Sequence, residues 1–380
     1  MTKGGHVSFR APVRLARTLL SDASAREVFT NNLLKEFSYT HGLLKSLGHP
    51  KIFQIETTNN CPYTCNMCPR TYSMTRELGH MDIGLFRSIL DQMRPAWQVD
   101  HLGEDPSIVL VHFGEPMVYK HFLESVTHAH DRGFRVRIST NPSVWTKSRI
   151  DEIIDVGLDE MWVMMDGMDD ATSMGIRGRA ASFVRGEANV RSLLEKKVRL
   201  GVKRPIVHLN MVKHPQNAHQ WQEFKSFWTG VEGVDHVNLF DFSTFGGNVT
   251  ELVQIGGTLA SQDPVQEHAA ERYDRVAQYP CYYPWHSMTV TWDGRVVPCC
   301  RDHNDATVLG DATRQSLEEI WNGPALQDLR RQFVKNRVTA VPCVTCKERS
   351  DEIGLPGYFY PFSLINAKRL TAKINGQTFP

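Results

Sequence analysis

The sequence predicts an α/β protein with a parallel β-sheet, and three observations support this fold class. Six short runs rich in β-branched and aromatic residues occur between residues 51 and 246. Amphipathic patterns with a helical period separate these runs. The resulting βα alternation is typical of parallel strands, because the crossover between two such strands is usually a helix. Periodicity alone does not distinguish an open sheet from a partial barrel.

The expected elements follow one another in this βα order. A helical region is expected within residues 1–50, where Gly48 and Pro50 stop the pattern. Its apolar residues are Phe29, Leu33, Phe37, Leu44 and Leu47. The six expected strands are 52–56, 108–112, 134–139, 161–165, 206–211 and 234–240. The helices between them include Phe86, Val126, Ile153, Leu193 and Phe224. The loops after parallel strands gather at one edge of the sheet, where α/β proteins place their chemistry.

A change in composition after Gly246 indicates a second region. A polar stretch, residues 246–278, leads into a compact segment that holds five of the eight cysteines. Within this segment we expect a hairpin over residues 287–297, turning at Asp293-Gly294, and one helix over residues 316–333. These changes divide the chain into an N-terminal helical cap, a core, a second domain and a C-terminal tail. The four ranges are 1–50, 51–246, 247–350 and 351–380.

Composition and charge exclude several classes of protein. The 43 lysines and arginines balance 42 acidic residues, so the net charge of +1 gives no global attraction to nucleic acid or to an anionic membrane. No apolar run approaches the roughly 18 residues of a membrane span, and residues 1–17 lack the apolar core of a signal peptide. We therefore expect a cytoplasmic globular protein that binds neither nucleic acid nor membrane. Without a secretory signal, its eight cysteines indicate metal or redox chemistry.

The first cysteine group lies directly after the first expected strand. Cys61, Cys65 and Cys68 fall within eight residues of one loop and can converge on one metal centre. A structural zinc site normally has four ligands, and no fourth ligand is close in the sequence. An iron–sulfur cluster held by three cysteines instead leaves one iron open to a further ligand. The number and position of these cysteines therefore favour a cluster over a structural metal site.

This CxxxCxxC loop resembles the signature of the radical S-adenosylmethionine (SAM) enzymes. The resemblance implies a partial (β/α)6 TIM-like barrel and a 4Fe–4S cluster bound by Cys61, Cys65 and Cys68. In that family the open iron chelates SAM, and reductive cleavage gives a 5′-deoxyadenosyl radical that takes a hydrogen atom from the substrate. An electron donor such as flavodoxin or ferredoxin is then an expected partner.

Further residues at strand ends resemble the SAM contacts of that family. Gly114-Glu115-Pro116 resembles the GGEP motif that holds the SAM amino group, with Phe113 in place of its first glycine. Thr140 and Asn141 follow the third strand. The resemblance places Asp166 near the SAM ribose and Arg177 near the SAM carboxylate, and includes Tyr63 and Met67 among the cofactor-binding residues. Met67 replaces a preferred aromatic residue, and Met164 stands where serine is common.

The second cysteine group can close a site with four ligands. Cys281, Cys299 and the pair Cys343-x-x-Cys346 flank the expected hairpin and helix. Structural zinc is the alternative, although zinc ribbons more often use two CxxC pairs. The layout resembles the SPASM/twitch extension of radical SAM enzymes, which implies one auxiliary 4Fe–4S cluster with these four ligands. Cys300 is then an apolar filler, an alternative ligand or a hydrogen-atom donor.

The resemblance extends to radical SAM enzymes that modify aminocyclitols and sugars in antibiotic and other natural-product biosynthesis. It implies a small-molecule polyol substrate whose alcohol is oxidised to a ketone, since a fully ligated second cluster is suited to electron transfer. The candidate catalytic residues are Cys300, Asp241 and His112, and Glu56, Asn210 and His214 also end strands on the expected face. A sugar dehydratase, an epimerase and a peptide maturase would use the same parts. A zinc-stabilised binding protein is the non-catalytic alternative.

Overall fold

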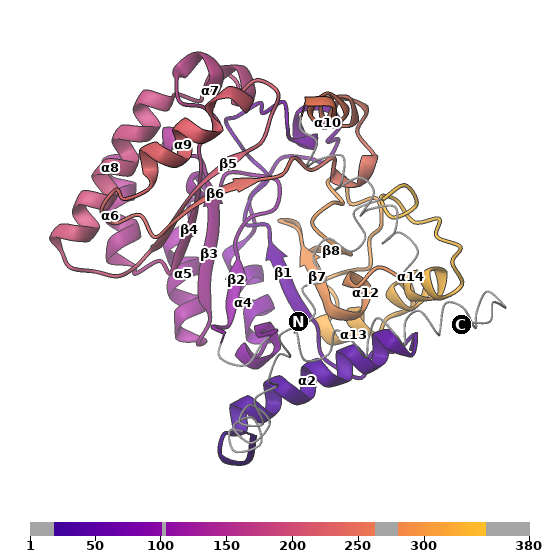
Figure 1. The fold of residues 1–380 in the computed structure, drawn as a ribbon. Helices are drawn as coiled ribbons and strands as arrows, with labels where there is room; N and C mark the ends of the chain where they lie inside the picture. The colour runs from indigo at the N-terminus through magenta and orange to yellow at the C-terminus, as the bar shows by residue number, and fades with distance from the viewer. Residues whose placement is uncertain (1–18, 101–103, 263–279, 347–380) are drawn as a thin grey trace, which may run out of the picture.

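The six expected strands are present in the structure. The computed structural model describes residues 19–100, 104–262 and 280–346 (Figure 1). The strands are β1 (Lys51–Ile55), β2 (Ser107–Val109), β3 (Arg135–Thr140), β4 (Glu160–Met164), β5 (Ile206–Val212) and β6 (His236–Phe240). Their ends differ from the expected ends by only a few residues. The sequence therefore predicted the succession of these strands along the chain correctly.

The expected connecting helices are also confirmed. They are α4 (Ile83–Asp91), α5 (Phe122–Asp131), α6 (Lys147–Asp155), α8 (Phe183–Arg199) and α9 (Trp221–Trp228). Shorter turns complete the connections: α3 (Pro69–Tyr72), η1 (Pro95–Gln98), η2 (Pro116–Val118), η3 (Pro142–Val144), η4 (Ala218–Gln220) and η5 (Phe245–Gly247). Two helices are not among the expected elements, α7 (Asp170–Arg177) and α10 (Thr250–Gln262). Helix α7 buries only Ser173 and Ile176, and α10 contains a Gly-Gly pair that disfavours a helix.

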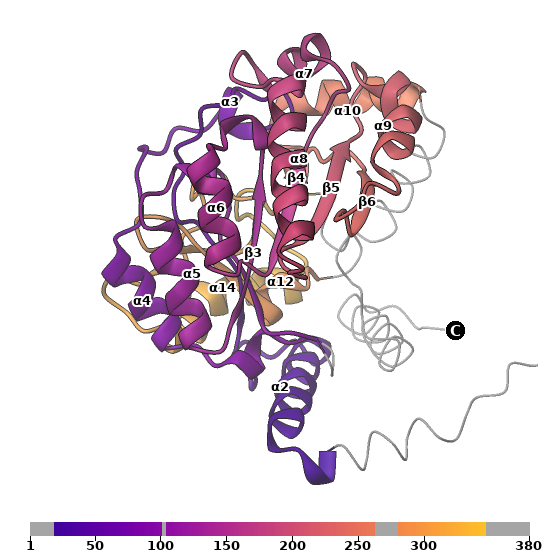
Figure 2. The ribbon, with the colours of Figure 1, turned by 90° about the vertical axis from the view of Figure 1, so that its left-hand side faces the viewer.

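Strands β2 to β6 form a five-stranded parallel sheet in sequence order. Helices α5, α6, α8 and α9 cover one face of it (Figure 1, Figure 2). Residues on this face, such as Val136, Met161 and Leu209, are fully buried. Because alternate residues of a strand point to opposite faces, the remaining positions line the inner face of a partial barrel. The sheet thus presents its strand ends and its inner face to the candidate site.

Strand β1 joins the core to the C-terminal region. It lies beside β2, but its strand hydrogen bonds go to β7 (Ser287–Val290), which runs parallel to it. Strand β7 continues antiparallel into β8 (Arg295–Val297), and β8 pairs with β9 (Gly310–Asp311). The strand that leads into the first cysteine loop is therefore the first strand of a sheet completed by the region that carries the second cysteine group.

The C-terminal hairpin is confirmed, and the helix after it is only partly correct. The β7–β8 turn contains Gly294 at a positive φ of 89°, which favours glycine. The helix expected over residues 316–333 is divided into α13 (Leu317–Trp321) and α14 (Pro324–Val334). Pro324 cannot continue a preceding helix but is well placed in the first turn of a new one. A single turn, α12 (Tyr283–His286), precedes the hairpin.

The N-terminal helix α2 (Ala23–Thr40) is confirmed, but the apolar residues of its pattern do not mark its buried face. Leu33 and Phe37 are 43% and 46% exposed, whereas Lys35 and Ser38 are fully buried. Polar anchors set this orientation, because the Tyr39 hydroxyl donates to the carbonyl of Pro280 at 2.9 Å. The helix ends before Leu44 and Leu47, which do not extend it.

Residues 1–18 of the expected cap, the segment 263–279 and residues 347–380, including the expected tail, lie outside the described residues.

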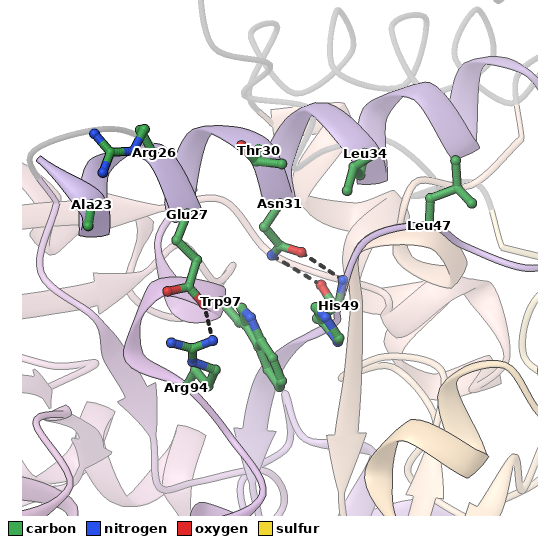
Figure 3. A pocket seen from close by; sticks show the side chains of 10 residues that line it. All are labelled: Ala23, Arg26, Glu27, Thr30, Asn31, Leu34, Leu47, His49, Arg94 and Trp97. Carbon is green, nitrogen blue, oxygen red and sulfur yellow. Dashed lines mark hydrogen bonds and ion pairs between the residues drawn. The ribbon is translucent and has the colours of Figure 1, made fainter. Parts of the chain in front are cut away.

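A groove of about 410 Å³ lies between α2 and η1 (Figure 3). His49, Trp97 and an ion pair between Glu27 and Arg94 line it. It adjoins the start of β1 and contains none of the expected site residues, which follow the strand ends. In the three described ranges, no helix is long and apolar enough to cross a membrane.

Candidate active site

The first cysteine loop follows β1 and is held by its own backbone and by α7. The Cys68 amide donates to the Cys65 carbonyl at 3.2 Å, and Cys68 is the N-cap residue of α3. The amides of Thr64 and Asn66 donate to the carbonyls of Arg177 and Ile176 at 3.1 and 2.8 Å. Three elements therefore fix the path of the loop.

The thiols of this loop are a donor set that fits an iron–sulfur cluster. Burial is the main cause that raises the pKa of Cys61 and of Cys68 to about 12, and charge on Cys65 contributes to both shifts. The three sulfurs are thus close enough to interact, and they lie in a site that disfavours uncompensated thiolates. Among the described residues, no three His, Cys, Asp or Glu side chains converge as ligands of one metal ion. Thiolates bound to separate irons of a cluster need not converge on one point.

Glu115 joins the ends of β2 and β3. Its carboxylate accepts from the Thr140 hydroxyl at 2.6 Å and from the Asn141 amide at 3.0 Å. Burial raises the pKa of Glu115 to about 7, while these hydrogen bonds oppose the shift. The charge of Glu115 in turn raises the pKa of Cys61. The structure therefore brings three expected SAM contacts together beside the cysteine loop.

Gly114 is required by close packing of the backbone. A Cβ atom at this position would overlap the carbonyl oxygen of Thr58, which precedes the cysteine loop. The next amide, of Glu115, donates to the Asn60 carbonyl at 2.9 Å. Pro116 then starts the short helix η2. The motif after β2 therefore holds the approach to the cysteine loop through its backbone.

Arg177 and Asp166 form a buried ion pair next to the loop. The guanidinium also donates to the Cys65 sulfur at 3.7 Å. Burial raises the pKa of Cys65, and the charge of Arg177 opposes this shift. Asp166 accepts from the Val212 amide at 2.7 Å, so the pair is tied to the end of β5.

Tyr63 and Met67 belong to one apolar cluster at the first cysteine loop. The Tyr63 hydroxyl donates to the Asn141 carbonyl at 3.4 Å. Met67 packs against the Tyr63 cluster and also against a separate cluster around Phe242 and Leu252. The nine residues expected to contact SAM are therefore grouped around the cysteine loop and the adjacent strand ends.

The second cysteine group is also buried. Cys281, Cys299, Cys343 and Cys346 are each at most 9% exposed, and Cys300 is half-buried. Burial raises the pKa of Cys299 well above its usual value, and charges on Cys300, Cys343 and Cys281 raise it further. Cys346 packs against Gly246 at the end of the core. The second group thus gathers residues that are far apart in the sequence.

The three candidate catalytic residues occupy different environments. The His112 imidazole lies 3.1 Å from the carbonyl oxygen of Cys300, and burial lowers its pKa to about 4. Because the partner is a carbonyl, the neutral ring donates from Nε2. Asp241 follows β6, is 58% exposed at its side chain, and pairs with Lys213 at 3.1 Å. The structure therefore brings His112 and Cys300 together and leaves Asp241 at the opposite edge of the sheet.

Glu56 is the most highly connected carboxylate near the site. It is fully buried and accepts two hydrogen bonds from Arg76, at 2.8 and 2.7 Å. It also accepts from the amides of Phe113 and Trp292, at 3.1 and 3.2 Å. Burial favours a higher pKa for Glu56, but Arg76 and His112 hold the pKa below its usual value. These bonds use the carboxylate fully, so Glu56 does not fit the role of a general base.

Arg76 is the residue that sequence reasoning missed. It lies in the loop between α3 and α4, where no periodicity or motif distinguishes it. Its guanidinium bonds Glu56, donates to the His303 carbonyl at 2.8 Å, and lies 3.5 Å from Asp305. Burial raises the pKa of Asp305 to about 7, and Arg76 opposes that shift. A single arginine thus connects the core to the segment after Cys300.

Two family models match this chain in the places where the geometry puts the two cysteine groups. The model of the radical SAM superfamily matches residues 55–227, and the SPASM iron–sulfur cluster-binding domain matches residues 281–347. The protein is a radical SAM enzyme with a SPASM domain. These domains imply a SAM-binding 4Fe–4S cluster, an auxiliary iron–sulfur centre and SAM as cofactors.

Curated relatives of this radical SAM enzyme differ in what they modify. The tungsten-containing aldehyde ferredoxin oxidoreductase cofactor-modifying protein of Pyrococcus furiosus is 25% identical over 79% of this chain and 88% of its own length. A PqqA peptide cyclase of Bradyrhizobium diazoefficiens is 23% identical over 82% of each chain. The SAM-dependent 2-deoxy-scyllo-inosamine dehydrogenase of Niallia circulans is 22% identical over 79% of this chain and 93% of its own length.

A solved structure shares the fold. SuiB of Streptococcus suis, bound to its precursor peptide SuiA, superposes with a TM-score of 0.58 and 16% identity, over 91% of this chain and 78% of SuiB. This likeness supports the architecture of the radical SAM enzyme described above.

We predict that Gly114→Ala destabilises the fold by about 1–3 kcal/mol, because the added methyl group overlaps the Thr58 carbonyl. Chemical denaturation of the purified protein measures the change. Gly257→Ala is the matched control, since a Cβ there meets no atom within 4 Å and alanine favours the helix. Equal stability of the two variants would contradict the packing role of Gly114.

We predict that Glu56→Gln costs about 3–5 kcal/mol, because it leaves the buried Arg76 charge without its main partner. The exposed neighbour Glu77→Gln is the control and should change stability little. The midpoint of denaturant unfolding measures both variants. A loss for Glu56→Gln no larger than that of the control would refute its central role.

Proposed function

We propose that the enzyme removes hydrogen from a carbinol of a small polyol, aminocyclitol or sugar and forms a ketone. The inner face of the barrel carries this proposal. Parallel barrels usually fill their interior with branched apolar side chains. Here the inner positions of four successive strands include the polar or aromatic residues Arg137, Trp162, His208 and Asn238. Such a surface suits a substrate with several hydroxyl or amino groups.

Contacts within this inner face support a polar substrate. Glu160 pairs with Arg137 at 2.9 Å and with His208 at 3.2 Å. The Arg137 guanidinium lies 5.1 Å from the centre of the Trp162 ring. On the neighbouring strands, the Asn238 amide donates to the Asn210 side chain at 2.9 Å. These contacts orient the polar groups of the inner face with respect to one another. The aminocyclitol dehydrogenase among the relatives agrees with this substrate class.

The remaining roles follow from the environments of the residues. We propose Cys61, Cys65 and Cys68 as ligands of the SAM-binding cluster, and Cys281, Cys299, Cys343 and Cys346 as ligands of the auxiliary cluster. When bound, these clusters and SAM supply the one-electron chemistry of hydrogen removal. Asp241 is the proposed proton acceptor, because its carboxylate is the accessible one among the candidates. His112 holds the backbone of Cys300 through its Nε2 proton.

Peptide modification is the second candidate function. Among the described strands, β6 pairs on one side only, and each of its residues is at least partly exposed. An exposed strand edge can bind an extended peptide by adding a strand. The PqqA peptide cyclases among the relatives support this alternative. A dehydratase or an epimerase would use the same polar inner face.

We predict that the reduced, reconstituted enzyme forms more 5′-deoxyadenosine from SAM when an aminocyclitol such as 2-deoxy-scyllo-inosamine is added. Mass spectrometry should then detect the ketone, with one SAM consumed per product. Synthetic peptides serve as the alternative substrates in parallel reactions. A product of unchanged mass would indicate epimerisation, loss of water would indicate a dehydratase, and turnover of peptides alone would refute the small-molecule proposal.

We predict that Cys65→Ala lowers the iron content from about eight to about four irons per chain and abolishes 5′-deoxyadenosine formation. Cys299→Ala should also lose iron but retain SAM cleavage, because the first loop is intact. Iron analysis and chromatography of the SAM products measure the two effects. Zinc in place of iron in the wild-type protein would end the enzymatic interpretation.

A further inference from the structure

The C-terminal end of α7 is bonded directly to the first cysteine loop. Besides the two backbone hydrogen bonds to Thr64 and Asn66, the Asn66 side chain donates to the Gly175 carbonyl at 3.1 Å. Helix α7 ends at Gly178, whose φ of 82° favours glycine, and a Cβ there would overlap the Thr64 hydroxyl. The backbone of Arg177 therefore has a fixed position relative to the loop.

The side chain of Arg177 is fixed as firmly as its backbone. It is 11% exposed, and its partner Asp166 is fully buried. One terminal nitrogen of the guanidinium donates to the Cys65 sulfur, while Nε and the other terminal nitrogen bond Asp166. The Val212 amide holds the second oxygen of Asp166. The pair is therefore an oriented dipole whose positive end faces the sulfur.

We propose that Arg177 raises the reduction potential of the cluster that Cys65 ligates, through its N–H···S hydrogen bond and its charge. This inference rests on the proposed ligand set of the first cluster. Reduction adds negative charge, and part of it resides on the cysteine sulfurs. Hydrogen bonds to these sulfurs and nearby charge are among the factors that set cluster potentials. In a buried site with little water, a cation at this distance acts strongly.

The ion pair makes the effect testable by its sign. Arg177→Gln removes the positive end of the dipole, so reduction becomes harder and the potential falls. Asp166→Asn removes the negative end and leaves the guanidinium uncompensated, so the potential rises. The asparagine oxygen can still accept the Val212 amide, which preserves the end of β5. A merely structural role of the pair would not give opposite shifts.

The test is a redox titration monitored by electron paramagnetic resonance, on the full-length reconstituted protein without SAM or substrate. The signal of the first cluster is identified by its loss in Cys65→Ala. At a fixed applied potential, we expect Arg177→Gln to lower the ratio of reduced to oxidised cluster about tenfold. This change corresponds to a reduction potential that is about 59 mV lower for a one-electron couple. Asp166→Asn should raise that ratio. The exposed neighbour Arg179→Gln is the matched control and should leave it unchanged.

The possible outcomes separate this inference from the proposed function. Normal iron content with unshifted potentials, or with shifts of the same sign, would overturn the role of Arg177 and leave the proposed function standing. If Arg177→Gln fails to retain the cluster, the test rests on Asp166→Asn. A fall or no change in the ratio of reduced to oxidised cluster in that variant then overturns the inference. An iron-free wild-type protein would overturn the proposed function and, with it, the role of Arg177.

Discussion

The buried contact between Glu56 and Arg76 is the interaction on which the rest of the site depends. A carboxylate without exposure to water is costly unless charged and polar partners surround it. Glu56 obtains these partners from three segments: the loop after the first cysteines, the end of β2 and the C-terminal hairpin. Each segment leads to residues proposed to bind a cofactor. One buried carboxylate thus connects segments that lead to both cysteine groups.

The sheet that contains β1 and β7 also connects the core to the C-terminal region, through backbone hydrogen bonds. Strand β1 pairs with β7, and the Glu56 amide donates to the Val290 carbonyl at 2.8 Å. The core and the C-terminal region therefore meet through continuous hydrogen bonding and not only through side chains. Arg76 extends this connection by bonding the His303 carbonyl. The segments that carry the two cysteine groups therefore share one hydrogen-bonded framework.

Much of the core could be predicted because its signals are local. The strands β1 to β6 and most connecting helices follow from periodicity, and the position of Cys61, Cys65 and Cys68 after a strand follows from adjacency in the sequence. Helix α7 could not be predicted, because it buries too few apolar residues to give a period. The periodic pattern also did not indicate which face of α2 is buried, because Tyr39 and Lys35 are held by residues far away in the sequence.

By itself the sequence determined the order of strands and helices, the two cysteine groups and the strand ends that carry Glu115, Asn141 and Asp166. These features depend on neighbours along the chain, so composition and spacing reveal them. Only the tertiary structure decided that β1 pairs with β7, that Glu56 is a structural hub and that Arg177 contacts the Cys65 sulfur. Each of these depends on which distant segments share a buried space, and the cost of burying charge selects the partners there.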